Sequence, residues 1–241
     1  MQNSNSKHSE EASHTAYIEI AKAFDRLTYK SIYIYDDIQK KIEYISNHRF
    51  FLHNRTSEEI IGMGEQLFST FIKAEDHSIV NQANQAGSAF YATLPESERK
   101  SYTLAYNVHL VDENQNILLV NHRLTPLLLT NEGQIWKTLG MISLATSNLP
   151  GNITLTKDGD NTILKYDIET EQWIHHSKIA LSEREIQILR FYAQGLTINE
   201  IASVLNLSAD TIKFHRRNLL LKMEVNTINK ALAYATAYKL I

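Results

Sequence analysis

The sequence predicts an α+β chain in which an antiparallel sheet with helices is followed by a β-hairpin extension and then by an all-α unit of four short helices. Two observations predict this class. From Tyr102 to Leu110 apolar and polar residues alternate, as they do in a half-buried strand. Between Leu181 and Met223 apolar residues recur at helical spacing, and helix-capping residues precede each run. These patterns divide the chain into four segments: 1–14, 15–149, 150–178 and 179–241.

The composition is typical of a folded protein and excludes several kinds of site. Of the 241 residues 43% are hydrophobic and 21% are charged, which suffices for two compact domains. The absence of cysteine excludes disulfides, thiolate metal sites and cysteine nucleophiles. The first residues lack the apolar core of an export signal, and no stretch approaches the roughly 18 apolar residues of a membrane helix. We therefore expect a cytoplasmic protein without a membrane partner.

The N-terminal half is predicted to begin with a disordered tail over residues 1–14, because these residues are polar. A helix that caps its own domain or pairs with a partner is predicted next by an apolar stripe of Tyr17, Ile20, Phe24 and Leu27. Two strands are predicted over 31–38 and 41–46, where isoleucine and tyrosine are frequent.

Helices and then strands follow. Thr56 and Glu59 form a capping box for a short helix that we expect to end at Gly62. Two more helices are predicted over about 66–72 and 75–90, and three strands over 102–110, 117–124 and 134–144.

Residues 150–178 predict a β extension that joins the two domains. Asp158-Gly159 is a strong hairpin signal, and a second hairpin is predicted over 162–175. The adjacent His175 and His176 project to opposite faces of a strand, so they cannot easily chelate one metal ion. No metal site is expected here or elsewhere.

The C-terminal helices are marked by their ends. Ser182 and Thr197 each stand three residues before a glutamate, and Ser208 opens a third helical run. Gly195 suits the left-handed residue that ends the first helix, and a fourth helix starts near Thr227. The buried stripe of the first helix is predicted to be Ile186, Leu189 and Ala193. Two helices joined by a turn as short as Asn206-Leu207 form a helix-turn-helix, whose second helix can enter the major groove of DNA.

The third of these helices has two different sides. Its apolar side holds Ile212, Leu219 and Met223, and its opposite side holds Asp210, Lys213, Phe214, Arg217 and Leu221. Lysine and arginine can donate to guanine or to phosphate, and phenylalanine can contact a thymine methyl. A solvated basic helix is the simpler interpretation of four basic residues, but the capping boxes and the glycine favour the DNA-reading one.

This stretch resembles the LuxR/FixJ-type DNA-binding domain of bacterial transcription regulators, through LSEREIQIL, GLTINEIA and LSADTIKFH. The resemblance implies that Lys213, Phe214 and Arg217 contact bases. It implies phosphate-contacting or helix-supporting roles for Thr197, Ser208, Thr211, His215, Arg216 and Lys222. It also implies that the last helix pairs two subunits through Ala231, Ala235 and Tyr238 with Leu232. The sequence departs from the family pattern at Asn199, Glu224 and Ile228, where lysine, glycine and arginine are usual.

The first half resembles a PAS domain in its element order and in the segments IEYIS, TSEEIIG and AED. Such domains use a five-stranded sheet and a crossing helix to enclose a small cavity, or they pair with one another. His122, Tyr106 and Val120 are candidate residues of a sensor pocket, although a lone core histidine is more often a packing residue. His77 is the position to check for haem, and a polar residue in a helix's first turn is its simpler interpretation. No cofactor is predicted.

Together the resemblances imply a sequence-specific transcription regulator. Its PAS-like domain would sense a small-molecule or protein signal and govern the binding of a homodimer to double-stranded DNA; RNA polymerase is a candidate partner. The alternatives are a signalling adaptor or a sigma-factor-like interaction module. Residues 181–241 carry eight Lys and Arg against five Asp and Glu, in a chain whose net charge is −3, as expected if only this part meets phosphate. No catalytic motif is present, so we do not expect an enzyme.

Overall fold

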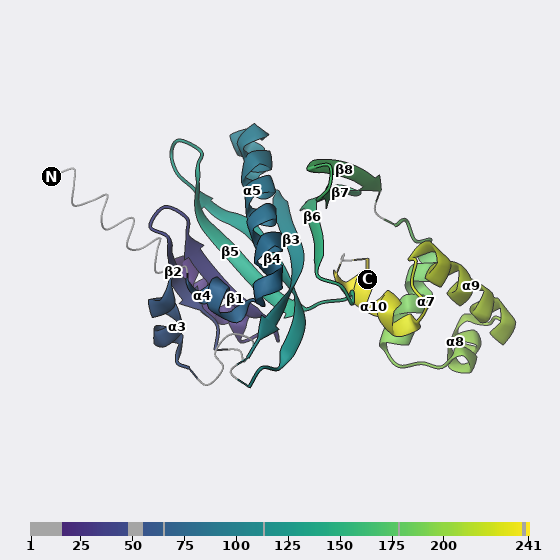
Figure 1. The fold of residues 1–241 in the computed structure, drawn as a ribbon. Coiled ribbons are helices and arrows are strands. Elements are labelled where there is room, and N and C mark those ends of the chain that lie inside the picture. Colours follow the sequence, from purple (N-terminus) through teal and green to yellow (C-terminus); the bar gives the residue numbers. More distant parts are fainter. Residues whose placement is uncertain (1–15, 48–54, 65, 113, 178, 238–239) are drawn as a thin grey trace. The chain divides into compact units, whose positions relative to one another are not determined.

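The computed structural model describes residues 16–47, 55–64, 66–112, 114–177, 179–237 and 240–241. The chain forms two compact units, Met1–His176 and Ser177–Ile241, which we describe separately (Figure 1). The tail predicted over residues 1–14 lies outside the described residues. In the ranges that the structure describes, no helix is long and apolar enough to cross a membrane.

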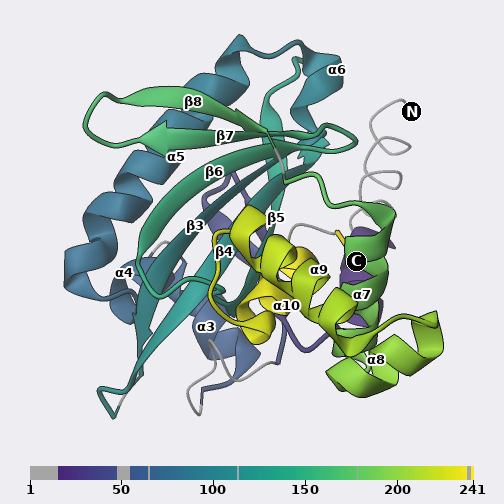
Figure 2. The ribbon, with the colours of Figure 1, turned by 90° about the vertical axis from the view of Figure 1, so that its right-hand side faces the viewer.

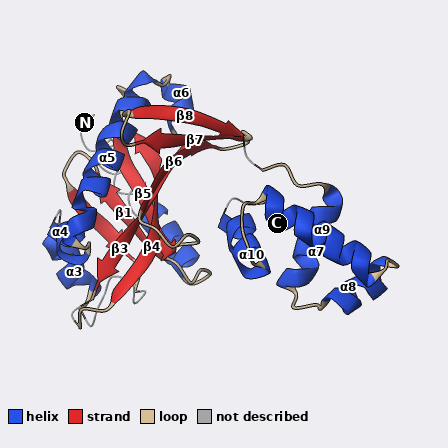
Figure 3. Cartoon of the chain, turned by 45° about the vertical axis from the view of Figure 1, so that its right-hand side comes forward, coloured by secondary structure: helices blue, strands red, loops and turns tan. Residues whose placement is uncertain are grey.

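The N-terminal unit is built on one antiparallel sheet. In the described residues its strands follow the order β2-β1-β5-β4-β3-β6-β7-β8 (Figure 3). The strands are β1 (Ser31–Asp36), β2 (Lys41–Ile45), β3 (Tyr102–Val111), β4 (Ile117–Leu129), β5 (Ile135–Leu144), β6 (Gly151–Lys157), β7 (Thr162–Asp167) and β8 (Gln172–Ser177). Strand β1 pairs with β2 on one side and with β5 on the other. Because β1, β5 and β4 lie between β2 and β3 in the sheet, the helices that connect β2 to β3 must cross one of its faces.

These crossing elements are α3 (Ser57–Met63), α4 (Gln66–Phe71), a 3-10 turn (Ala74–Asp76), α5 (His77–Thr93) and α6 (Glu96–Arg99). The long helix α5 lies across the sheet (Figures 1 and 2) and contacts β3 and β6. Its small residues Ala83 and Ala86 are buried, which lets the helix approach closely. The alternation predicted for β3 is confirmed, since Leu104, Tyr106, Val108 and Leu110 all lie in the core beneath this helix.

The opposite face of β1 and β5 is covered by a helix over residues 16–25. Ala21 packs with Ile32 and Ile34, and the Tyr17 hydroxyl donates to Glu43 Oε2 at 2.6 Å. The predicted apolar stripe is wrong for three of its four residues, because Ile20, Phe24 and Leu27 are 69%, 43% and 83% exposed. The side chains of this helix that contact the sheet are those of Tyr17, Ile18 and Ala21.

Several element ends differ from the predictions for local reasons. Helix α3 has the predicted capping box at Thr56, but it continues through Gly62 and ends at Met63, before Gly64 at φ +55°. Strand β4 continues past Pro126 to Leu129, because register shifts in its pairing with β5 accommodate the missing N–H of the proline. The segment predicted as a β extension is continuous with the sheet: Leu155 of β6 pairs with Leu104 of β3 and is completely buried.

The C-terminal unit consists, in its described residues, of α7 (Glu183–Ala193), α8 (Ile198–Leu205), α9 (Ala209–Lys222) and α10 (Ile228–Ala237). The capping boxes at Ser182 and Thr197 and the side-chain cap at Ser208 are all present. Gly195 adopts φ +84°, as the predicted end of α7 requires. The helices expected from the sequence are confirmed.

Two predictions about this unit are wrong. Ala193 is exposed, and the buried stripe of α7 runs through Glu185, Ile188 and Leu189. Ala231 and Ala235 of α10 are fully buried against Leu189, Leu219 and Met223 of their own unit. These two residues are therefore not available to a second subunit in this structure, whereas Leu232 is half-buried and Tyr238 lies outside the described residues.

Candidate nucleic-acid interface and candidate ligand cavity

Helix α9 separates its apolar residues from its charged ones. Ile212 and Leu219 are fully buried, whereas Lys213, Phe214 and Arg217 are exposed. We call these last three residues the α9 face. Phe214 is 60% exposed, which leaves its apolar ring in water beside the two cations.

The two cations of the α9 face are available to a ligand. Lys213 Nζ pairs with Asp210 Oδ1 at 3.0 Å, but both side chains are well exposed, so this pair contributes little stability. Within the described ranges, Arg217 has no ion pair or hydrogen bond from its side chain. Neither guanidinium nor ammonium would therefore lose a strong partner on binding an anion or a base edge.

The hydroxyl residues near the face hold the helix ends. Thr197 accepts from the Glu200 amide at 3.4 Å, and Ser208 accepts from the Thr211 amide at 3.1 Å. Thr211 also bonds to Ser208 through its own hydroxyl, at 2.8 Å. These contacts are the helix-supporting part of the predicted roles; phosphate contacts by the same residues stay predictions.

Lys222, His215 and Arg216 are more enclosed than the α9 face. Lys222 Nζ lies 2.8 Å from Glu185 Oε2, which ties the end of α9 to α7. Burial acts to raise the pKa of the Glu185 carboxyl, but the bonds from Lys222 and Ser182 outweigh it and leave the pKa below its usual value. His215 is half-buried, with its ring 5.8 Å from that of Phe214. Arg216 is half-buried, and its Nε is buried without an acceptor in the part of the chain described.

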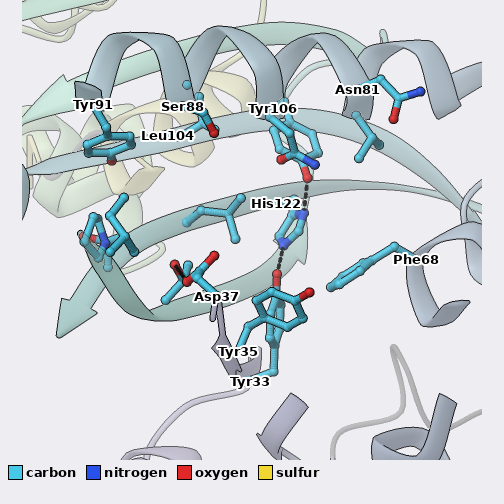
Figure 4. A pocket seen from close by; sticks show the side chains of 18 of the residues that line it. Tyr33, Tyr35, Asp37, Phe68, Asn81, Ser88, Tyr91, Leu104, Tyr106 and His122 are labelled. Atoms are coloured by element: carbon cyan, nitrogen blue, oxygen red, sulfur yellow. Dashed lines mark hydrogen bonds between the residues drawn. The ribbon is translucent and has the colours of Figure 1, made fainter. Parts of the chain in front are cut away.

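The N-terminal unit contains a cavity of about 680 Å³ between α5 and the sheet (Figure 4). This volume lies within the range of about 300–1,000 Å³ that small-molecule sites occupy. Of the predicted pocket residues, His122 and Tyr106 line the cavity. Val120, two residues before His122 on β4, does not line it and is completely buried in the core.

His122 is bonded to two tyrosines, one on each side (Figure 4). Its Nε2 lies 2.7 Å from the Tyr33 hydroxyl and its Nδ1 lies 2.7 Å from the Tyr106 hydroxyl. All three residues are at most 2% exposed, and burial lowers the pKa of His122 to about 3. The imidazole is therefore neutral at physiological pH, with a hydrogen on one nitrogen. We call this group the Tyr–His–Tyr triad.

Tyr33 and Asp37 also line the cavity, although neither was predicted as a site residue from the sequence. The only signal for Tyr33 was its place in a predicted strand, since its partner His122 is 89 residues away in the chain. His77 lines the cavity, but its Nε2 is bonded to the Ile72 carbonyl at 3.1 Å. Among the residues that the structure describes, no group of three or more His, Asp or Glu side chains could hold a metal ion.

Comparison with known proteins shows that the C-terminal unit is similar to one known family. Residues 180–235 match the family described as bacterial regulatory proteins, luxR family. The nitrate/nitrite response regulator protein NarP of Escherichia coli is 53% identical over 47 residues, 20% of this chain and 22% of that protein. The quorum-sensing regulator RhlR of Pseudomonas aeruginosa is 40% identical over 63 residues, 26% of each chain. The matches thus span about a quarter of these relatives, and they confirm the predicted LuxR-type helix-turn-helix.

Two solved structures are similar to this chain only at TM-scores below 0.5. The PAS domain of a protein from Colwellia psychrerythraea covers 53% of this chain and 94% of its own length, with 16% identity and a TM-score of 0.39. The structure titled VqmA bound to DPO covers 92% of this chain and 87% of its own, with 14% identity and a TM-score of 0.36. The five strands β2-β1-β5-β4-β3 and the crossing helix α5 are the arrangement implied by the PAS resemblance.

Proposed function

We propose that this chain is a sequence-specific, dimeric transcription regulator, in which the PAS-like unit governs how the luxR-family unit binds DNA. The observation that carries the proposal is the α9 face: two cations and an aromatic ring are exposed on the second helix of a helix-turn-helix. The match of residues 180–235 to the luxR family supports the same role.

The chemistry of the α9 face fits base reading. Arg217 and Lys213 would donate to O6 and N7 of guanine, and Phe214 would contact a thymine methyl. The ends of α8 and α9, with Thr197, Ser208 and Thr211, would lie near the phosphates and fix the orientation of the helix. Double-stranded DNA is therefore the proposed macromolecular partner, and a cytoplasmic location is part of the same proposal.

Two copies would bind an inverted repeat with their recognition helices about 34 Å apart, one helical turn of DNA. Since Ala231 and Ala235 are buried, the copies would meet through other surfaces of the chain. The cavity in the PAS-like unit would receive the signal, and RNA polymerase would be contacted at the promoter. The proposal includes no catalytic step.

Selection of binding sites from random duplex DNA by the full chain tests the proposal. We expect enrichment of an inverted repeat and binding that weakens steeply as salt rises, because phosphate contacts release counterions. A variant with Lys213→Ala and Arg217→Ala should enrich no sequence. If the wild-type chain enriches none either, the helix-turn-helix serves protein contacts, as in a signalling adaptor.

A further inference from the structure

The Tyr–His–Tyr triad has more hydrogens than internal bonds. Two tyrosine hydroxyls and one neutral imidazole carry three polar hydrogens, but the triad contains only two hydrogen bonds. When His122 carries its hydrogen on Nδ1, Tyr33 donates to Nε2 and the imidazole donates to the Tyr106 oxygen. The O–H of Tyr106 is then available for an acceptor outside the triad.

An acceptor bound there would complete a one-way chain of donors. Tyr33 would donate to His122, His122 to Tyr106, and Tyr106 to the ligand. Hydrogen bonds in such a chain polarise one another, and they are stronger in a buried site than in water. Tyr33, His122 and Tyr106 all line the cavity, so the end of this chain can be reached by a molecule inside it.

The cavity also presents an acceptor. The Asp37 side chain projects into it (Figure 4), and its Oδ2 accepts from the Thr138 hydroxyl at 2.6 Å. No donor among the described residues reaches its Oδ1. Burial raises the pKa of this carboxyl above its usual value, although Thr138 and Lys40 act against the rise. Asp37 is half-buried, so a ligand donor at Oδ1 would replace the water that this oxygen loses when the cavity is filled.

Charge in the cavity disfavours anions. Among the described residues that line it, Asp37 carries the acidic side chain and Lys40 the cationic one, and Lys40 is exposed at the rim. His122 cannot supply a positive charge, because burial keeps it neutral. The buried Lys137 acts on Asp37 but is already paired with Asp36 and Glu43 and does not line the cavity. An anion inside would therefore be desolvated near a carboxylate without an unpaired buried cation to balance it.

We propose that the cavity binds a small, non-anionic polar molecule that accepts a hydrogen bond from Tyr106 and donates one to Oδ1 of Asp37. This inference rests on the sensory role given to the cavity in the proposed function. It narrows the signal to uncharged or cationic compounds with an acceptor and an N–H or O–H donor, and it excludes carboxylates and phosphates.

Three probes of similar size test the proposal by ligand-detected NMR titration of the full chain. Benzamide has an acceptor and N–H donors, acetophenone has the acceptor alone, and benzoate is an anion. We expect benzamide to bind about 10-fold more tightly than either of the others, which corresponds to about 1.4 kcal/mol. Equal or tighter binding of benzoate, or binding of no probe, would overturn the proposal.

Two variants assign the contacts. Tyr106→Phe should weaken benzamide about 10-fold, whereas Tyr91→Phe should not, because the Tyr91 hydroxyl in the same cavity already donates to the Tyr102 carbonyl at 3.0 Å. Asp37→Ala should remove the preference for benzamide over acetophenone. Unchanged benzamide affinity in Tyr106→Phe, or an unchanged preference in Asp37→Ala, contradicts the proposal.

The result of these probe titrations does not depend on whether the chain binds DNA. The variant with Lys213→Ala and Arg217→Ala keeps the whole N-terminal unit, so it should bind benzamide as the wild type does. A chain that binds no DNA but shows the expected probe pattern would refute the proposed function and leave the ligand class intact.

Discussion

Gly140 of β5 lies directly beneath the ring of Tyr33, and a Cβ built on this glycine would overlap the ring atoms. The two residues are also partners in the pairing of β1 with β5. The absence of a side chain at Gly140 thus allows Tyr33 to lie across β5 and reach His122 on β4. The Tyr–His–Tyr triad depends on this glycine as much as on its own three members.

Gly140→Ala should displace the Tyr33 ring and break its bond to His122. We expect a loss of about 1–3 kcal/mol in the free energy of unfolding, as for other overpacked cores. Both tryptophans, Trp136 and Trp173, lie in the N-terminal unit, so urea unfolding followed by tryptophan fluorescence measures it. Gly62→Ala is the control: a Cβ there meets nothing within 4 Å inside a helix, and it should raise stability by about 0.5–1 kcal/mol.

His122 should make the N-terminal unit less stable in mild acid. Its pKa falls from an ordinary 6.5 to about 3 on folding, so between these values the unfolded chain binds a proton that the folded one does not. The free energy of unfolding should therefore fall by up to about 1.4 kcal/mol for each pH unit below 6.5. His122→Gln should flatten this slope, while His176→Gln, at an exposed position, should not. If the free energy of unfolding depended on pH equally in the wild type and both variants, His122 would not be the group responsible.

The backbone of Glu224 is strained, and this residue occupies a position at which the family usually has glycine. It follows α9 with φ +53°, a conformation that costs a residue with a Cβ about 1–2 kcal/mol. We expect Glu224→Gly to stabilise the C-terminal unit by about 1 kcal/mol, measured by thermal unfolding with circular dichroism. Glu224→Ala removes the charge but keeps the Cβ, so it should gain much less. A gain as large in alanine as in glycine would assign the effect to charge.

Lys222 should matter for stability as well as for DNA. Lys222→Met leaves the Glu185 carboxylate, which is 5% exposed, without its cation, and we expect a loss of about 1–2 kcal/mol. Lys213→Met removes a lysine from an exposed pair and should cost less than about 0.5 kcal/mol. Thermal unfolding of both variants distinguishes the two lysines; similar losses would show that the bond to Glu185 contributes little.

The α9 face should determine sequence preference. Arg217→Ala and Lys213→Ala should each weaken binding to the selected site by about 1–3 kcal/mol, with a smaller effect on random duplexes. Fluorescence anisotropy at fixed salt measures both. Arg190→Ala removes an exposed cation from α7 and should leave the preference unchanged. Equal losses on selected and random DNA would make Arg217 and Lys213 phosphate contacts.

The features predicted correctly are those encoded locally. The capping boxes at Ser182 and Thr197 and the left-handed Gly195 involve residues within four positions of one another, so their geometry follows from the sequence. The buried stripe of α7 was mispredicted, because apolar residues at Ile186 and Ile188 allow two phases of the same period. Which one is buried depends on the packing of α8 and α9.

The cavity could be predicted only in part. His122 was recognised from its alternation with the core residues of β4. Its partner Tyr33 and the acceptor Asp37 depend on β1 lying beside β5, and their contacts to His122 and Thr138 span 89 and 101 residues. A register that joins such distant strands is set by the assembled core, and no local pattern specifies it.

The burial of Leu155 and Ile153 beside β3 has a practical consequence for separating the two halves of this molecule. A fragment that stops at residue 149 would lose these two core side chains and that of Leu164. It would also expose the backbone N–H and C=O groups along one edge of β3, which favours aggregation. A fragment that extends to residue 176 keeps that edge paired, and it is the shorter piece we would expect to remain monodisperse.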